Sequence, residues 1–554
     1  MTEPSEPQNP VERADEGAEL PEGPQTAQSR PTMTVDVNLA TDEEKHRDHP
    51  PIRWRELLSL LLLVVLSDLT IYRTEGFAGP AALFVIAPLL IWFGAPRRVI
   101  SFSVFVVTTL LLIAAAKLLW SGSGLLVICG LTLLFAFAMS LTGQVPYMLE
   151  ICLFTAQTLV AGNRGLSYYG DRFRERSDST RGTRWMNIVM PSAAALMFGS
   201  IFLLANPDLV AAFSERMQNV VLSLKRWLHG FSTWEIVFWC VSLWISVGLL
   251  RPIVSRATRK EAAVDQPAKE RAPLYSPFRN TLLTVIGLFG VYLAFEFRTL
   301  WFREFPDGFY YSGYAHEGAA WLTLALGLAT IVLSLIFRVQ TLSDPRLGWL
   351  KKLAWVWSLE NSLLAVTVYH RLMIYVGFNG MTRMRVVGFL GITCVAIGFA
   401  LVVWKIIHHQ RFTWLMRRQL WTVAGAVFVY AVLPVDMLVH TYNVRRILAG
   451  DPAPSVQISV HPITNDGYIV LTPLLKSGNE IIREGVRAML AARMGSLEQT
   501  FIKQNSLGWT ALQYGDHKAR EQLVLIEPDF ETYYDPTLRE QALDRFHEYS
   551  YQWY

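Results

Sequence analysis

Long apolar stretches alternate with short polar ones along most of the chain, and eleven apolar blocks can be marked. Most of these blocks reach the ~20 residues that a helix needs to cross ~30 Å of hydrocarbon. The pattern therefore predicts an all-α fold, a polytopic transmembrane helix bundle of about eleven spans. The predicted spans are 57–72, 77–95, 99–120, 123–143, 188–205, 234–250, 281–301, 317–337, 353–376, 386–407 and 419–441.

The charge of the loops between these blocks indicates which side of a membrane each loop faces. Lys and Arg in short loops are retained on the cytoplasmic side. With the N-terminus placed in the cytoplasm, the inner segments carry 26 basic residues and the outer loops carry seven. We therefore expect a cytoplasmic N-terminus and an extracytoplasmic C-terminus. The inner segments are 45–55, 96–98, 163–187, 251–276, 338–352 and 405–418.

A twelfth apolar segment, Tyr147 to Ala161, needs a separate interpretation. It is only fifteen residues long and contains Glu150 and Gln157. If it crossed the membrane, every basic loop after it would face outward, against the charge rule. We therefore interpret it as an interfacial or re-entrant helix rather than a span.

Two polar regions flank the predicted bundle, which covers residues 51–441. Residues 1–50 contain no Phe, Trp or Tyr and carry twelve acidic against four basic residues, which predicts a disordered acidic tail. After His440, short apolar patches alternate with charges and turn-prone dipeptides, so residues 442–554 are predicted to form a mostly helical extracytoplasmic tail. Within it, Ile481 to Met494 has the clearest helical spacing.

The composition agrees with a membrane protein and offers no catalytic chemistry. Hydrophobic residues make up 52% of the chain and charged residues 17%. We find no nucleotide, metal or catalytic motif, so the sequence predicts no enzyme, no cofactor and no nucleic-acid partner. An enzyme acting on lipid would need a nucleophile beside a base, and none is evident. The oligomeric state is not indicated. No disulfide framework is implied, because the four cysteines all lie in apolar segments: Cys129, Cys152, Cys240 and Cys394.

Charged residues inside the predicted spans are the best functional candidates. A charge at mid-bilayer costs at least ~2.5 kcal/mol and is normally hidden in the bundle or in a wet cavity. Two interpretations are open: a polar or proton-responsive pathway, or interhelical pairs that lock the helices together. The candidates are Glu296, Glu360, Arg371, Asp436 and His440.

The spacing of these candidates suggests how they are arranged. Eleven residues of helix bring Arg371 back to the face of Glu360, but ~16 Å further along, so the two cannot pair directly. We expect Glu296, Lys117 or Asp436 to serve as partners. Asp436 and His440 are four residues apart and share a face after Pro434, which can kink its helix.

Two late stretches carry a family resemblance. The stretch YHRLMIYVGFNGMTRMR contains Arg371, Tyr375, Phe378, Gly380, Thr382 and Arg385, and YNVRRILAG followed by HPITNDGYIVLTPLL contains Asn443, Arg446, Asp466 and Leu474. Both resemble junctions in bacterial multi-pass membrane proteins classified as domain of unknown function four-one-seven-three and its relative four-one-five-three. In this chain Asn379-Gly380-Met381 stands where that pattern has Phe-Gly-Leu. The resemblance covers about 282–475 and implies a bacterial inner-membrane protein, but no activity.

Two function classes follow from the sequence. One is a non-enzymatic membrane protein that senses or scaffolds through its outer tail, where a protein partner could bind. The other is a transporter of a small solute or protons along the buried charges. A transporter of the common kind would show internal symmetry and paired broken helices, whereas only Pro434 interrupts a predicted span. The lipid bilayer is the partner expected in either case.

Overall fold

The apolar blocks fold into helices, and no strand occurs in the residues that the structure describes, so the all-α prediction is confirmed. The structure is a computed structural model. The predicted acidic tail, residues 1–50, lies outside the described residues, as does part of the predicted span 188–205. The structure describes residues 51–178, 189–198, 232–253, 274–301, 311–337 and 346–554, apart from residues 97, 196 and 409.

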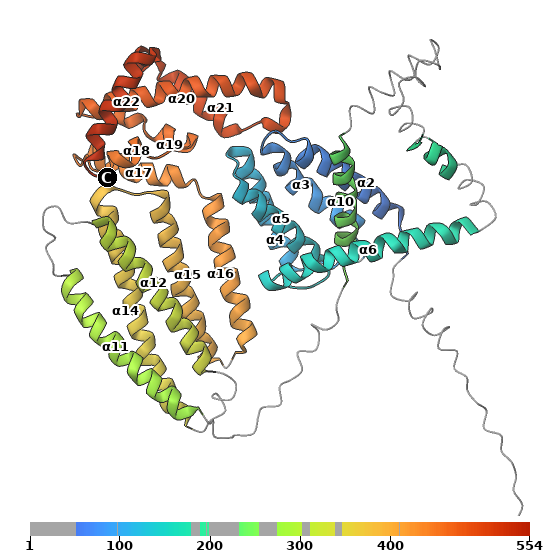
Figure 1. The fold of residues 1–554 in the computed structure, drawn as a ribbon, viewed down its shortest axis with the longest axis horizontal. Coiled ribbons are helices and arrows are strands. Elements are labelled where there is room, and N and C mark those ends of the chain that lie inside the picture. The colour runs from blue at the N-terminus through green and yellow to red at the C-terminus, as the bar shows by residue number, and fades with distance from the viewer. Residues whose placement is uncertain are drawn as a thin grey trace, which may run out of the picture. The chain divides into compact units, whose positions relative to one another are not determined.

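The helices before residue 254 form a first bundle around one apolar core (Figure 1). Phe84, Leu111, Leu118 and Leu126 are almost completely buried in it. Small residues let the helices approach closely, since a Cβ at Gly130 would overlap the ring of Phe84. The elements are α2 (Trp54–Ser67), the π-helix η1 (Asp68–Tyr72), α3 (Ala78–Gly94), α4 (Phe102–Trp120), α5 (Gly124–Leu141), α6 (Met148–Asp178) and α10 (Thr233–Leu250).

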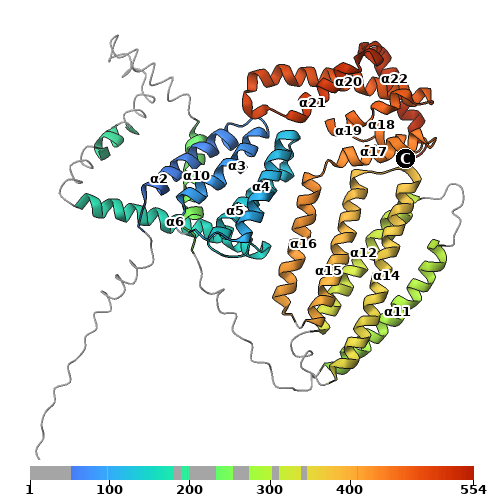
Figure 2. The same ribbon diagram turned by 180° about the vertical axis from the view of Figure 1, so that it is seen from behind.

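A second bundle of five long helices follows, and both ribbon views show α14, α15 and α16 running alongside one another (Figure 2). Its core is built around Trp357, with Leu282, Leu333 and Val402 fully buried. Helix α14 contacts α11, α12 and α15. The elements are α11 (Tyr275–Trp301), α12 (Tyr311–Ile336), α14 (Leu347–Asn379), α15 (Arg383–Ile407) and α16 (Phe412–Val432).

Residues 435–554 form a third unit with a core of its own, which we call the cap. The predicted helix from Ile481 is confirmed within α20, and Ile482, Val486 and Leu490 are completely buried. The elements are α17 (Val435–Leu448), α18 (Ser455–Ser459), α19 (Asn465–Val470), η3 (Thr472–Lys476), α20 (Glu480–Leu507), η4 (Trp509–Ala511), α21 (Tyr514–Leu525), η5 (Glu527–Asp529), η6 (Glu531–Tyr534) and α22 (Pro536–Tyr551).

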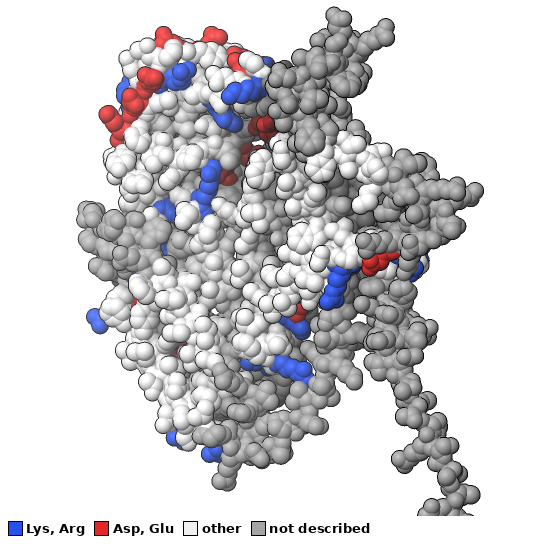
Figure 3. All heavy atoms as spheres, turned by 45° about the vertical axis from the view of Figure 1, so that its right-hand side comes forward, with Lys and Arg blue, Asp and Glu red and all other residues white. Residues whose placement is uncertain are grey.

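Five helices in the described residues are long and apolar enough to cross a membrane, or six if one bent pair counts as a span. The five are Phe102–Trp120, Gly124–Leu141, Thr233–Leu250, Tyr275–Thr299 and Arg383–Ile407. On the face shown in Figure 3, the surface between the two ends of the helices is largely without Lys, Arg, Asp and Glu. These helices could cross a membrane, and the count of eleven spans stays a prediction.

The bent pair corrects one predicted span. Block 419–441 is not one straight helix, because α16 ends at Val432 and α17 begins at Val435, with an angle of 68° between them. Pro434 lies at the break, where it has no N–H for the helix ladder and its ring disfavours continuation. The predicted kink is confirmed, and it carries Asp436 and His440 out of α16 into α17.

The segment predicted as interfacial belongs to a longer helix than the sequence suggested. Helix α6 runs for 31 residues from Met148 to Asp178, past the expected end at Ala161. It is not among the candidate spans. Its polar second half takes in the first part of the basic segment 163–187 and packs against α10, with Tyr169 buried in the core of the first bundle.

Candidate functional site

The two stretches that carry the family resemblance meet where the second bundle joins the cap. The Asn443 side chain on α17 accepts a hydrogen bond from Met381 N at 2.7 Å and donates one to Met381 O at 3.0 Å. Asn443 is completely buried. The turn that presents Met381 depends on Gly380, whose φ of +98° lies in the region that favours glycine. We call this region the junction.

Two arginines satisfy the carbonyl groups at the end of α14. Arg446 of α17 donates to Val376 O at 2.8 Å and to Gly377 O at 2.7 Å. Buried Arg385 of α15 donates to Gly380 O and, at 2.5 Å, to Asn379 Oδ1. Cationic side chains at a helix C-terminus complement its free carbonyls and its dipole. These arginines therefore fix the end of α14 against α15 and the cap.

Aromatic and hydroxyl groups complete the junction. The Arg385 guanidinium stacks 3.6 Å from the ring centroid of Tyr375. Thr382 is the N-cap of α15, where its hydroxyl accepts a hydrogen bond from Arg385 N at 3.2 Å. Phe378 lies in the last turn of α14, beside Asn379, whose side chain donates to Trp553 O at 3.0 Å.

Asp436 forms an ion pair with a residue that the sequence did not single out. Arg383 donates two hydrogen bonds to its carboxylate, and Thr464 N donates a third at 2.7 Å. Asp436 is 4% exposed, so this pairing is needed to bury its charge. His440 lies beside it, since both side chains pack against Gly467. Among the described residues His440 Nδ1 has no hydrogen-bond partner.

Asp466, the acidic residue of the second motif, links the cap to the first bundle. It accepts a hydrogen bond from Trp120 Nε1 at 2.7 Å and pairs with Lys117 Nζ at 3.4 Å, both on α4. Gln513 strengthens the same contact, because it accepts from Gly122 N at 2.8 Å and donates to Leu118 O at 3.2 Å. The motif thus joins the cap to both bundles.

Next to Asp466, the side chain of Asn465 forms hydrogen bonds that link three helices of the cap. Asn465 donates to Asp516 of α21 and accepts from Arg493 Nε of α20 at 2.6 Å. Burial raises the pKa of the Asp516 carboxyl, and the Arg493 charge partly offsets this.

Glu296 and Arg371 form the clearest buried ion pair of the second bundle. Arg371 Nε lies 2.5 Å from Glu296 Oε1, and Nη2 lies 2.7 Å from Oε2. Tyr292 OH donates to the same carboxylate at 2.9 Å. The prediction that Glu296 is a partner for Arg371 is confirmed. Glu360 lies apart from this pair on α14, against Gly290 of α11, so the five candidate residues do not form one cluster.

The comparison with protein families supports the resemblance on which this junction was predicted. The family described as Domain of unknown function (DUF4153) matches residues 78–464. The chain belongs to the DUF4153 family. Neither a search of curated proteins nor a search of solved structures finds a match to it. The DUF4153 match begins at α3 and ends beside Asp466, so it covers the first bundle except α2 and η1, the second bundle and the start of the cap.

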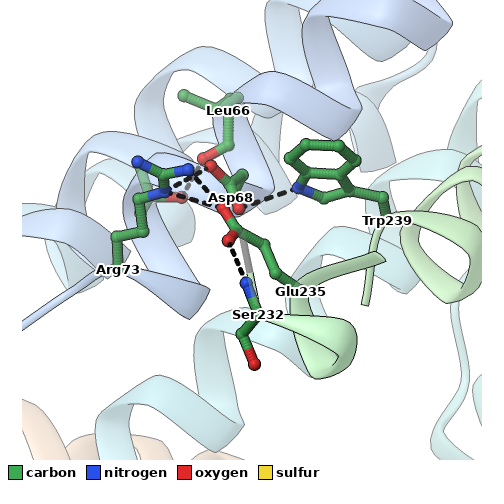
Figure 4. A network of polar contacts seen from close by, with 7 residues as sticks. Leu66, Asp68, Arg73, Ser232, Glu235 and Trp239 are labelled. Carbon is green, nitrogen blue, oxygen red and sulfur yellow. Dashed lines mark hydrogen bonds and ion pairs between the residues drawn. The ribbon is translucent and has the colours of Figure 1, made fainter. Parts of the chain in front are cut away.

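Some polar contacts of this DUF4153 chain were missed from the sequence. Arg383 lies inside the motif, between Thr382 and Arg385. It could have been proposed as a contact residue from its position beside them. In the first bundle Arg73 bonds Asp68 and Glu235, while Trp239 Nε1 donates to Asp68 at 2.8 Å (Figure 4). No periodic signal predicts this network, because its members come from η1, a loop and α10. In the described residues no group of three or more His, Cys, Asp or Glu could hold a metal ion.

Proposed function

We propose that the chain is a multi-pass protein of the bacterial inner membrane that senses or scaffolds, without catalysis, through an extracytoplasmic cap. The observation that carries this proposal is the use of the family motif. Its polar residues bond backbone groups and opposite charges that join the cap to α14, α15 and α4. A cap that is bonded to both bundles can transmit a mechanical force, or a conformational change caused by binding, to either bundle. A protein partner would bind the cap.

The contacts between loops agree with the predicted topology in one respect, because they place the cap at the helix ends that carry the predicted outer loops. Loops predicted to be outer meet the cap, through Glu75 N with Thr510 and Gly122 N with Gln513. Segments predicted to be cytoplasmic meet one another at the opposite helix ends, as when Arg251 pairs with Glu56. This sorting follows if the N-terminus is cytoplasmic and the C-terminus is extracytoplasmic.

A second set of contacts at the cytoplasmic ends agrees with this topology. Arg417 at the start of α16 pairs with Glu150 at the start of α6, at 2.5 Å. Trp421 Nε1 donates to Pro146 O at 3.0 Å. These contacts favour α6 as a helix that lies along the membrane surface.

The alternative, transport of a small solute or protons, receives less support from the same charges. A pathway needs polar groups that can exchange partners, whereas Glu296 and Asp436 are each buried against an arginine. Removing one member of such a pair leaves an uncompensated buried charge, which costs roughly 3–5 kcal/mol. We therefore favour a structural role for both pairs.

Reconstitution separates the two functions. The full chain in sealed vesicles with an internal pH-sensitive dye is expected to leave an imposed proton gradient unchanged relative to empty vesicles. A complementary experiment expresses Asn443→Leu in a strain that lacks the chain. If sensing or scaffolding by the cap is the function, this variant inserts into the membrane normally but does not restore the phenotype caused by loss of the chain. Dissipation of the gradient, or full complementation by a variant with a detached cap, would favour transport.

A further inference from the structure

The buried acidic side chains of the described residues have a common property. Each of them has a basic partner within ion-pair distance. A membrane-embedded carboxylate without a cation is strongly disfavoured in its charged form. The pairs are Glu56 with Arg251, Asp68 and Glu235 with Arg73, Glu296 with Arg371, Asp436 with Arg383, and Asp466 with Lys117.

Glu360 differs from all of these residues. It lies within predicted span 353–376 and is partly exposed where α14 packs on α11, yet its Oε2 is buried. Among the described residues this oxygen has no hydrogen-bond partner and the side chain forms no ion pair. Its Oε1 lies 3.5 Å from the position that a Cβ on Gly290 would take, so the carboxyl group packs directly on α11.

Two residues on the same turn of α14 also have polar side-chain atoms without a hydrogen-bond partner among the described residues. Trp357 Nε1 and Asn361 Oδ1 are buried without a hydrogen-bond partner among the described residues, and the two side chains are 1% and 0% exposed. The Trp357 ring meets Phe289 of α11 edge-on, at a centroid distance of 6.0 Å. Three buried polar atoms within about one turn of α14 therefore have no hydrogen-bond partner among the described residues, which is unusual for buried polar groups and needs an explanation.

The other charged groups on the adjoining helices are too distant to compensate Glu360. On its own helix the nearest such group toward the N-terminus is Lys352, about 12 Å away along the axis, and the nearest toward the C-terminus is His370, about 15 Å away. Helix α12 carries no charged residue between Gly318 and Ile336. The remaining charged groups on α11 and α14 are Arg279, Glu296, Arg298, Lys351 and Arg371, and those on α15, near its two ends, are Arg383, Arg385 and Lys405.

From this geometry we propose that Glu360 is a proton-binding site inside the second bundle. One proton from water converts the carboxylate into a neutral carboxyl, which removes the unpaired charge and supplies an O–H donor. Trp357, three residues earlier on the same side of α14, can then donate to the carbonyl oxygen. The proposal does not depend on the function of the cap, because it concerns a different site.

A lipid-soluble carbodiimide tests the proposal, since it adds to protonated carboxyls and reaches groups exposed to hydrocarbon. The full chain in lipid nanodiscs is treated with dicyclohexylcarbodiimide over a range of pH, and modified residues are located by mass spectrometry. We expect modification of Glu360, falling roughly tenfold for each pH unit above its midpoint. Ion-paired Glu296 should remain unmodified, and Glu360→Gln should lose the modification at this position.

A pair of variants at Gly287 makes the test specific. Gly287 lies one turn before Gly290 on α11, and a side chain added there meets open space. Gly287→Lys places a cation near the carboxyl and should abolish its modification, while Gly287→Leu adds similar bulk without charge and should not. Absence of Glu360 modification in the wild-type chain at acidic pH would overturn the proposal, as would equal modification of Glu360 in Gly287→Lys or of Glu296.

Discussion

The Asn443 side chain bonds both backbone groups of Met381, at 2.7 Å and 3.0 Å, although 62 residues separate them. An amide is the side-chain group that can serve a backbone N–H and C=O together in this way, because it carries an acceptor and a donor side by side. The pairing occurs where α17 leaves the membrane helices, and it holds the cap against the turn between α14 and α15.

Asn443→Leu should weaken this attachment. The substitution leaves the N–H and C=O of Met381, which are half-buried, without their partners, and a buried unsatisfied group costs roughly 1–3 kcal/mol. The unfolding midpoint of the full chain in detergent, measured by thermal denaturation, should fall clearly. Leu448→Ala, on an exposed part of the same helix, should change stability by less than about 0.5 kcal/mol. Equal effects of the two substitutions would mean that the amide pairing contributes nothing.

Gly380→Ala should be strongly destabilising for two reasons. Its φ of +98° is unfavourable for a residue with a Cβ, and that Cβ would lie 2.5 Å from Asn443 Oδ1. A strained backbone position of this kind costs on the order of 1–3 kcal/mol. Gly377→Ala is the matched control three residues earlier, in the last turn of α14, where a Cβ meets open space. It should be neutral or stabilising by up to about 1 kcal/mol, and tolerance of Gly380→Ala would count against the turn described here.

Arg383 and Asp436 should show strong energetic coupling. Asp436→Asn keeps an acceptor for Thr464 N but leaves Arg383 without its counter-charge, and Arg383→Gln leaves the buried carboxylate unpaired. In a double-mutant cycle of thermal stabilities, the double variant should be less destabilised than the sum of the single variants. We expect a coupling energy of ~1–3 kcal/mol. Additive effects would show that the two residues are not partners.

The partly buried carboxyl of Asp516 should make the stability of the cap depend on pH. Burial raises the pKa of this carboxyl above its value in the unfolded chain. An acid whose pKa is raised on folding costs stability at pH values above its folded pKa, and this cost disappears as the pH falls through that pKa. Lowering the pH from neutral should therefore stabilise the wild-type chain relative to Asp516→Asn. Paired thermal melts of the two chains would contradict this if their difference stayed constant with pH.

Much of the junction could be predicted from the sequence, because its residues stand in two compact motifs. Gly380, Arg385, Asn443 and Arg446 all lie where the resemblance placed a connection between late helices. The partner of Asp436 was not predicted, since hydrophobic periodicity locates a helix but not the rotation that brings Arg383 toward it. Nor could spacing predict that Asp466 contacts Trp120, because that contact joins segments 346 residues apart.

Helix ends were predicted less well than helix cores. Span 419–441 was expected to be one kinked helix, but the free energy of burying α17 in the cap favours a sharp break at Pro434. Helix α6 continues far beyond its apolar part although Gly165 and Gly170 lower its helix propensity, because this continuation packs against α10. The pairing of Glu296 with Arg371 was among the expected alternatives, and choosing it required the structure.

The central claim is that the family motif holds the cap on the extracytoplasmic ends of both bundles. Accessibility of single cysteines in whole cells tests it most directly, with the four native cysteines replaced. Leu525, 78% exposed on the cap, and Phe412, 55% exposed at the start of α16, are each changed to Cys and treated with a membrane-impermeant maleimide. The account predicts labelling of Leu525→Cys in intact cells and labelling of Phe412→Cys only after permeabilisation. The reverse pattern would contradict it.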